Sequence, residues 1–366
     1  MQFDEPSTGI CKEQLDTPVL LIDLDVMESN IQKMAEYFLG VSAELRPHTK
    51  THKTPIIAHK QIEAGAIGVT CAKLGEAEVM INSGIRDVLI ANEIVPPQKI
   101  AKLVSLARHA DVMVAVDDPR NVEDLSQAAQ SKGVLLRVLV EVDIGMKRCG
   151  VPPGEPALKL AQKVEQSKGL LFAGLMGYEG HTVTIPDFEE RKRETEKGLT
   201  LLIETKELIE RDGFEVGIVS GGGTGTYNIT GQFPGVTEVQ AGSYVFMDTY
   251  YRGVLKDFDC ALTVLATVIS RPDKNTAIID AGMKTVTREF GMPGIKDIGG
   301  VEVERLSEEH GKLDLSNSDV DLRPGDRLEL IPSHCCTTIN LHDKLYGIRD
   351  GILESVWDIA GRGRVR

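Results

Sequence analysis

Residues 135–178 read LLRVLVEVDIGMKRCGVPPGEPALKLAQKVEQSKGLLFAGLMGY. Two short apolar runs, Leu135–Val142 and Phe172–Tyr178, enclose an amphipathic segment at Glu155–Gln166. Apolar runs of this length are typical of strands, and the amphipathic segment has the pattern of a surface helix. The stretch therefore predicts a strand–helix–strand unit whose two strands are parallel.

The same alternation continues in both directions, from about Leu45 to Asp248. Six further strands are predicted at Leu45–His48, Ile67–Ala72, Asp87–Ile90, Val112–Val116, Val216–Ser220 and Thr237–Gln240. Further helices are predicted at Gly75–Ser83, Pro97–His109, Val122–Ser131 and Asp187–Arg211. Eight parallel strands with helices between them favour a closed (β/α)8 barrel of the TIM type. An open doubly wound sheet is the alternative.

The pattern changes after about Tyr250, where short strands follow one another without long helices between them. These strands are predicted at Leu262–Ser270, Thr276–Asp280, Arg327–Ile331, Lys344–Arg349 and Gly351–Trp357. Turn signals at 271–273 and 323–326 separate them. We expect two domains: a barrel at residues 24–250, and a mostly β domain formed by residues 1–23 and 251–366, which includes an opening strand at Pro18–Asp23.

Composition restricts the classes of function. The chain has 366 residues and a net charge of −14, with 42% hydrophobic and 26% charged residues. This charge argues against binding to nucleic acids or anionic membranes, although a few local groups can still hold a small phosphorylated ligand. The segment Met1–Gln14 lacks an apolar signal core, so we expect a cytoplasmic protein. The six cysteines show no disulfide framework and are expected to be free thiols or metal ligands.

A basic segment, Arg46–Lys53, stands where the first barrel strand should end. Chemistry in such barrels occurs at the carboxyl ends of the strands. A lysine there can form an imine with a carbonyl cofactor if its surroundings lower its pKa. Lys50 is the candidate, and a solvated basic loop is the alternative interpretation.

Two loops at the same edge favour a phosphate site. The glycine-rich run Val219–Tyr227 lets backbone amides approach an anion, and it lacks the lysine of a nucleotide-hydrolysing loop. In the following run, Gln240, Gly242 and Ser243 end the last predicted barrel strand. Small residues and hydroxyls on neighbouring loops can form a phosphate cup. Turns without a ligand remain the alternative.

The segment 331–338, which reads IPSHCCTT, is the most metal-like part of the chain. On an extended chain, side chains two positions apart share a face, so His334 and Cys336 are expected to bind one ion while Cys335 points away. Imidazole and thiolate together suit zinc, and two protein ligands leave positions for water or substrate. Ordinary packing is the alternative, because a single His-x-Cys is a weak signal.

Five segments stand in an order typical of one family: Arg46–Lys53, Gly145–Gly150, Val219–Tyr227, Glu238–Asp248 and His334–Cys336. With them the chain resembles the D-threonine aldolase and D-serine dehydratase family, which has an alanine-racemase-like barrel. The resemblance extends from Leu15 to Trp357. It is strongest to the low-specificity D-threonine aldolases and the 3-hydroxy-D-aspartate aldolases, which share the Ser-Gly-Gly-Gly-Thr-Gly and Gln-x-Gly-Ser-Tyr-x-Phe-Met-Asp runs.

The resemblance implies two cofactors, pyridoxal 5'-phosphate and a divalent metal ion (Zn²⁺, Mn²⁺ or Mg²⁺). It implies that Lys50 holds the pyridoxal phosphate as a Schiff base, that Arg148 lies near the ring oxygen and that Tyr178 lines the ring pocket. Gln240 is expected to face the pyridine nitrogen. The residues implied for the phosphate are Gly222, Gly223, Thr224, Gly242 and Ser243. Those implied for the metal are His334 and Cys336.

The implied substrate is a small D-amino acid with a β-hydroxyl group. An aldolase splits it into glycine and an aldehyde, with His181 as the candidate base and His52 as the alternative. In a dehydratase, Lys50 removes the α-proton instead and ammonia is released. Aldolases of this family tend to have His-x-Asp at the metal site and dehydratases His-x-Cys, so the His-Cys-Cys of this chain leaves the reaction type open.

Other interpretations are a non-catalytic cofactor carrier and a metal-free racemase. A carrier lacks the carboxy-terminal β domain, and a racemase needs a second base for which Tyr346 offers no suitable context. In this class of barrel the β domain often packs on a second subunit, which implies a homodimer.

Overall fold

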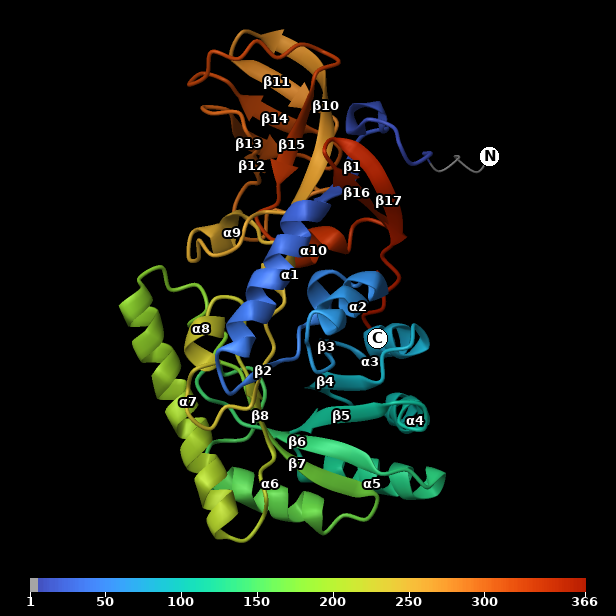
Figure 1. Ribbon diagram of the computed structural model, residues 1–366, viewed down its shortest axis with the longest axis vertical. Coiled ribbons are helices and arrows are strands. Elements are labelled where there is room, and N and C mark those ends of the chain that lie inside the picture. Colours follow the sequence, from blue (N-terminus) through green and yellow to red (C-terminus); the bar gives the residue numbers. More distant parts are fainter. Residues whose placement is uncertain (1–5) are drawn as a thin grey trace. The chain divides into compact units, whose positions relative to one another are not determined.

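The computed structural model describes residues 6–366, so Asp4 and Glu5 of the opening segment lie outside the described residues. The chain forms two compact units (Figure 1). The barrel unit comprises residues 33–50, 55–242 and 363–366. The strand unit comprises the described residues up to 32 together with 51–54 and 243–362. The division into domains at residues 24 and 250 stays a prediction.

The barrel unit contains an eight-stranded parallel sheet in the order β2-β9-β8-β7-β6-β5-β4-β3. A parallel bridge between His48 and Thr70 joins the two ends of this order, and the Thr70 N–H donates to the carbonyl of Pro47 at 2.9 Å. The sheet is therefore a closed barrel, as predicted, and the open doubly wound sheet is excluded. The strands are β2 (Glu44–Leu45), β3 (Val69–Cys71), β4 (Asp87–Glu93), β5 (Asp111–Val116), β6 (Leu136–Glu141), β7 (Leu170–Gly177), β8 (Ile218–Gly221) and β9 (Glu238–Val239).

Helices cover the outside of these strands (Figure 1). They are α2 (Pro55–Glu63), α3 (Leu74–Asn82), α4 (Pro97–Leu106), α5 (Pro119–Lys132), α6 (Glu155–Glu165), α7 (Phe188–Arg211) and the short α8 (Tyr227–Thr230). The limits of α5 show how local sequence sets a helix. Asp118 accepts hydrogen bonds from two backbone N–H groups at its start, and Gly133 ends it with a positive φ of 63°.

The inside of the barrel is packed with apolar side chains. Leu89, Met113, Ala115, Leu139 and Met176 form one buried cluster there. Because helices cover the outer faces of the same strands, the strands are buried on both faces. This double burial explains why the sequence shows continuous apolar runs in place of alternation.

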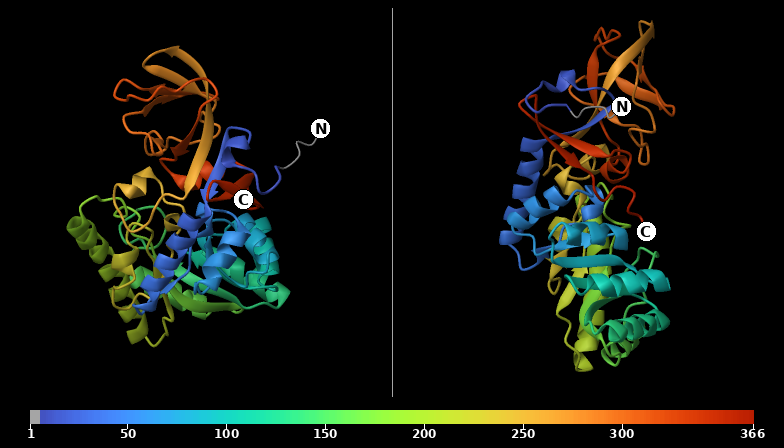
Figure 2. Two further views of the ribbon diagram at one scale, coloured as in Figure 1. Left: turned by 45° about the horizontal axis from the view of Figure 1, so that its top comes forward. Right: turned by 90° about the vertical axis from the view of Figure 1, so that its right-hand side faces the viewer.

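The strand unit contains a nine-stranded sheet in the order β13-β14-β11-β10-β1-β16-β17, with β15 paired to β10 and β12 paired to β15. The long strand β10, drawn in light orange in Figures 1 and 2, pairs with β1, β11 and β15. The opening strand belongs to this sheet, as predicted. The strands are β1 (Val19–Asp23), β10 (Leu262–Asp273), β11 (Thr276–Ile279), β12 (Gly294–Ile295), β13 (Glu302–Leu306), β14 (Gly311–Asp314), β15 (Arg327–Ile331), β16 (Lys344–Arg349) and β17 (Ile352–Asp358).

Some elements were not predicted: α1 (Leu24–Leu39), α2, α8, α9 (Thr249–Arg252), α10 (Cys335–Ile339) and the strands β12 to β14. The three strands are short or rich in charged residues, so they lack an apolar run. Among residues 6–366 no helix is both long and apolar enough to cross a membrane.

A buried arginine ties together three strands at one end of the barrel. Arg46 follows β2, and its Nε donates to Glu238 of β9 at 3.0 Å while its Nη1 donates to Asp87 of β4 at 2.5 Å. The side chains of Arg46 and Glu238 are each only 3% exposed. Burial by itself lowers the pKa of Arg46, but the two carboxylates outweigh it and raise the pKa. The guanidinium therefore stays charged inside the protein.

Arg46→Met should destabilise the protein by about 3–5 kcal/mol, because Glu238 would remain buried without its partner. Arg137→Met is the matched control. Arg137 pairs with Asp111 at 2.7 Å, but the Asp111 side chain is 50% exposed, so its loss should cost no more than about 1 kcal/mol. Denaturant unfolding of both variants measures the difference, and equal destabilisation would contradict the structural role of Arg46.

Candidate functional site at the barrel strand ends and in the strand unit

The glycine-rich loop after β8 is closed by its own hydrogen bonds. The N–H of Gly222 donates to Glu179 Oε2 at 3.1 Å, and the N–H of Gly223 donates to Thr226 Oγ1 at 3.2 Å. These two amides, which the resemblance implies for the phosphate, therefore each have an acceptor inside the loop. The glycines shape the loop, and a phosphate would need other donors.

The shape of the loop requires glycine at two positions. A Cβ at Gly225 would lie 1.8 Å from the carbonyl oxygen of Val183, and Gly222 has a φ of +75°. At Gly223, a Cβ would lie 3.2 Å from Tyr178 Oη. A side chain at Gly223 would thus crowd the Tyr178 ring, and glycine lets that ring lie close to the loop.

Three predicted cofactor residues lie next to one another at the ends of β6, β7 and β8. The guanidinium carbon of Arg148 lies 5.6 Å from the ring centroid of Tyr178, and Tyr178 Oη lies 3.2 Å from the place that a Cβ of residue 223 would take. Arg148 also lies 3.9 Å from the carboxylate of Glu141 while its side chain remains 48% exposed. The structure therefore brings Arg148, Tyr178 and Gly223 together and leaves the guanidinium accessible to a ligand.

Gln240 is held by the neighbouring strand. Its amide Nε2 donates to Ser220 Oγ at 2.8 Å, and its backbone N–H donates to the carbonyl of Gly221 at 2.8 Å. Its position directly after β9, two residues before Gly242, agrees with the predicted edge of the barrel. The side chain that was expected to face a pyridine nitrogen is thus a neutral amide fixed by one hydroxyl.

Lys50 lies in a short 3-10 helix, Thr49–Thr51, soon after β2. The hydroxyl of Thr49 donates to Glu76 at 2.5 Å, which fixes the backbone immediately before the lysine. The Lys50 side chain is partly buried. Its place at the end of the first barrel strand is the one predicted from the sequence.

The two candidate bases differ in their surroundings. His181 is exposed, and its ring lies against Gly145, where a Cβ would be 2.7 Å from Cε1. His52 is fully buried, and its Nδ1 accepts the N–H of Thr54 at 3.1 Å. His181 is therefore the more accessible imidazole, in the same set of loops as Arg148.

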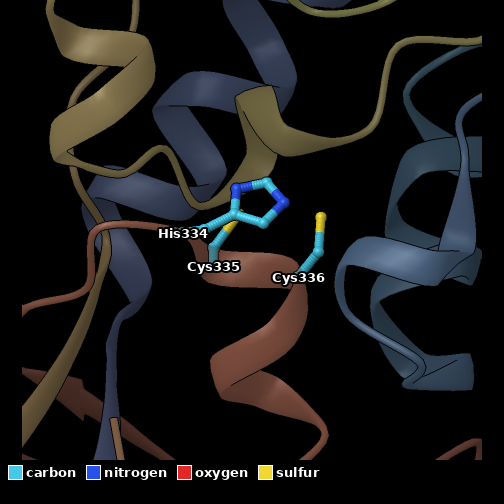
Figure 3. Close-up of side chains that lie close together, drawn as sticks. All are labelled: His334, Cys335 and Cys336. Atoms are coloured by element: carbon cyan, nitrogen blue, oxygen red, sulfur yellow. The ribbon is translucent and has the colours of Figure 1, made fainter. Parts of the chain in front are cut away.

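The predicted metal residues lie at the start of α10. His334 is the extended residue before the helix, and Cys336 is already helical. The expectation of an extended chain was wrong, but the turn into the helix still places His334 and Cys336 on one side (Figure 3). Ligand atoms of His334, Cys335 and Cys336 all lie within 4.8 Å of one another, so Cys335 does not point away as predicted.

Two observations favour Cys336 over Cys335 as a ligand. Complete burial raises the pKa of the Cys335 thiol well above its ordinary value, and metals bind the thiolate. Cys336 Sγ lies 3.3 Å from Thr51 Oγ1 and 3.6 Å from Ser243 Oγ. Thr51 follows Lys50 in the chain, and Ser243 follows Gly242. Ser243, predicted for the phosphate, is thus brought beside Cys336.

Asp248, a fully buried residue, orients His334. Its Oδ2 accepts from His334 Nδ1 at 3.0 Å and from the Cys335 N–H at 3.1 Å, and its Oδ1 accepts from the Tyr251 N–H at 2.8 Å. Burial alone lowers the pKa of His334, but hydrogen bonds with Asp248 and Cys336 raise it to about 10. With Nδ1 held by a carboxylate, Nε2 is the nitrogen available to a metal, as in many metal sites.

An acidic cluster in the barrel unit was missed in the sequence. Glu93, Glu141 and Cys149 have ligand atoms within 4.8 Å of one another. Burial and then Glu93 raise the pKa of Glu141 to about 8, and burial raises the pKa of Cys149 to about 11. Glu93 and Glu141 end β4 and β6, so their positions at strand ends were the available signal.

The closed barrel, the lysine after its first strand and the glycine loop after β8 define an alanine-racemase-like barrel enzyme. Residues 22–250 match the family model "Alanine racemase, N-terminal domain", and residues 261–348 match "Putative serine dehydratase domain". The chain belongs to the D-threonine aldolase and D-serine dehydratase family, whose members are pyridoxal-phosphate-dependent lyases. A non-catalytic carrier is thereby set aside.

The relatives cover nearly the whole chain. A D-threonine aldolase of an Arthrobacter species is 39% identical over 96% of this chain and 93% of its own. A 3-hydroxy-D-aspartate aldolase of Paracoccus denitrificans is 36% identical over 99% and 96%. The crystal structure of D-threonine aldolase from Filomicrobium marinum is similar with a TM-score of 0.97 and 40% identity, and covers 99% of this chain and 100% of its own.

The raised pKa of Glu141 predicts a loss of stability with rising pH. The folded state holds this proton up to about pH 8, while the ordinary pKa is 4.5. Its contribution is therefore complete below the ordinary value and is lost as the pH rises through the folded value. Glu141→Gln keeps the group neutral, so its thermal midpoint should fall less than that of the parent protein between about pH 5 and about pH 9.

Glu155→Gln is the control, because the Glu155 side chain is 62% exposed. Its pH curve should run parallel to that of the parent protein. A Glu141→Gln curve that also runs parallel would contradict a protonated Glu141.

Proposed function

We propose that this protein is a pyridoxal-phosphate- and metal-dependent lyase that cleaves D-β-hydroxy-α-amino acids, with D-threonine split into glycine and acetaldehyde. The observation that carries the proposal is the placement of Lys50, Arg148, Tyr178 and the glycine loop at the strand ends of one closed barrel. The similarity to D-threonine aldolase over nearly the full chain supports it.

The barrel residues fit pyridoxal phosphate. The exposed guanidinium of Arg148 suits the ring oxygen, Tyr178 offers a ring face, and Gly223 carries no side chain that would crowd that ring. Lys50 would hold the cofactor covalently, and Thr224, Gly242 and Ser243 are the donors proposed for its phosphate. When bound, the cofactor stores the electron pair released as a bond at the substrate α-carbon breaks.

The residues at α10 fit a divalent metal ion. His334 Nε2 and the Cys336 thiolate would hold it, and Asp248 would keep the imidazole in the required tautomer. A nitrogen–sulfur pair favours Zn²⁺, while Mn²⁺ and Mg²⁺ are the other ions proposed. The ion would supply a Lewis acid for an oxygen of the substrate.

Cleavage of the Cα–Cβ bond requires that the β-hydroxyl lose its proton. His181 is the proposed base because its ring is exposed and fixed against Gly145. His52 is less suited because it is fully buried. An exposed imidazole can also pass the proton to water, and the α-carbon of the glycine product takes up one proton from solvent, so that no proton is gained or lost overall.

Dehydration is the second candidate function, favoured by the thiolate ligand Cys336 and by the match of residues 261–348 to a serine dehydratase domain. In the dehydration reaction Lys50 takes the α-proton and the hydroxyl group leaves.

We also propose a homodimer, as in other barrels of this class. The six cysteines are free thiols, which supports a reducing compartment such as the cytoplasm.

Product identification tests the function. Incubation with D-threonine should yield glycine and acetaldehyde, measured by chromatography and an aldehyde assay. Formation of 2-oxobutanoate and ammonia would establish the dehydratase instead. D-serine and 3-hydroxyaspartate are assayed beside it, and Lys50→Ala is the inactive control. If none of the three substrates reacts, both candidate functions fail.

Removal of the metal tests the role of α10. A chelator should abolish most activity while the visible absorbance of the bound cofactor persists. Asp248→Asn should weaken metal binding by roughly 10–100-fold in a competition titration. The reason is that the amide NH2 group would replace the carboxylate oxygen that accepts the hydrogen bond from His334 Nδ1. Full activity without metal would remove His334 and Cys336 from the mechanism.

The matched control is Asp280→Asn. Asp280 lies in the same unit and accepts the Thr267 N–H at 2.8 Å and the Thr17 hydroxyl at 2.6 Å. It has no contact with His334 among the described residues, so its substitution should leave metal affinity unchanged.

A further inference from the structure

Glu179 is a fully buried residue in the loop after β7. Its carboxylate accepts three hydrogen bonds from the glycine loop and α8. Oε1 accepts from the hydroxyls of Thr226 at 2.8 Å and Thr230 at 2.5 Å, and Oε2 accepts from the Gly222 N–H at 3.1 Å. The carboxylate is therefore directed at the loop that carries the proposed phosphate site.

A second backbone amide reaches Glu179 through one hydroxyl. The Gly223 N–H donates to Thr226 Oγ1 at 3.2 Å, and that hydroxyl donates to Glu179. The carboxylate thus fixes the peptide groups of Gly222 and Gly223 in one orientation. The loop needs such an anchor, since its glycines have no side chains to pack and large conformational freedom.

The direction of these bonds also matters for electrostatics. A buried carboxylate is tolerated when hydrogen bonds satisfy it, and here one amide and two hydroxyls do so. Because the Gly222 amide donates to Glu179 and the Gly223 amide donates to the Thr226 hydroxyl, an anionic ligand is expected to be held by other donors of the loops. The orientation of the loop and the choice of its free donors are therefore set by one side chain.

We propose that Glu179 is a positioning residue that holds the Gly221–Thr226 loop in the conformation that accepts the phosphate group of the cofactor. It would act through its hydrogen bonds to the loop and to α8. The inference rests on the proposed function, because it requires that the barrel bind pyridoxal phosphate. Substitution of Glu179 should therefore weaken the binding of a ligand that carries the phosphate group, and it should leave the binding of the pyridoxal ring alone unchanged.

The test compares pyridoxal phosphate with pyridoxal, which lacks the phosphate. Glu179→Gln keeps the size of the side chain but puts an amide NH2 where an acceptor is needed. Thr230→Val removes one donor to the carboxylate. The matched control is Thr205→Val, which removes another buried threonine hydroxyl that accepts the Gly154 N–H at 2.8 Å.

Titration of the cofactor-free protein, followed by visible absorbance, gives the Kd for each ligand. Glu179→Gln should raise the Kd of pyridoxal phosphate by about ten-fold and leave that of pyridoxal within about two-fold. The ratio of the Kd for pyridoxal phosphate to the Kd for pyridoxal measures this effect. Thr230→Val should raise this ratio by a smaller factor, and Thr205→Val should leave it unchanged. If Glu179→Gln does not fold, Thr230→Val alone decides the test.

An equal change for both ligands would show a merely structural role and overturn the proposal, as would unchanged affinities. The parent protein and Lys50→Ala separate this failure from that of the proposed function. If the parent protein gives no visible absorbance with pyridoxal phosphate, the proposed function and this inference both fail. If it does and Lys50→Ala does not, an unaltered ratio in the Glu179 variant overturns the inference alone.

Discussion

The closure of eight parallel strands into a ring is the constraint on which the barrel unit depends. The bridge between His48 and Thr70 completes the ring, and Arg46 ties β2 to β4 and β9. In a parallel ring all carboxyl ends lie at one edge. Residues that are far apart in the sequence, such as Arg148 and Tyr178, are therefore neighbours, and their contact is a consequence of strand order.

Three of the buried carboxylates in the barrel unit are accommodated in three different ways. Glu238 is paired with Arg46, and Glu179 accepts hydrogen bonds from an amide and two hydroxyls. Glu141 retains its proton because burial, and then the carboxyl group of Glu93, raises its pKa. What decides among these outcomes is the supply of donors around each group. Only the second arrangement reaches the glycine loop, which is why it bears on the phosphate site.

In the strand unit, the turn from strand to helix organises the metal residues. His334 ends the extended segment and Cys336 begins α10, while Asp248 holds both the imidazole and the first backbone amide of the helix. One carboxylate thus positions a ligand and the element that carries the other ligand. The glycine loop resembles that of the aldolases, while the thiol at position 336 resembles that of the dehydratases. Cys336 is therefore the residue that leaves the reaction type open.

The sequence by itself determined the strand–helix alternation, the position of Lys50 after the first strand and the place of the glycine loop, because burial on both faces of parallel strands leaves continuous apolar runs. It did not predict β12 to β14 or α10, whose short segments lack such runs. It also missed Glu179, Asp248 and the Glu93–Glu141 pair. Only the tertiary structure decided those contacts, because hydrogen-bond partners separated by more than forty residues are fixed by strand order and loop geometry, and local sequence patterns do not record either one.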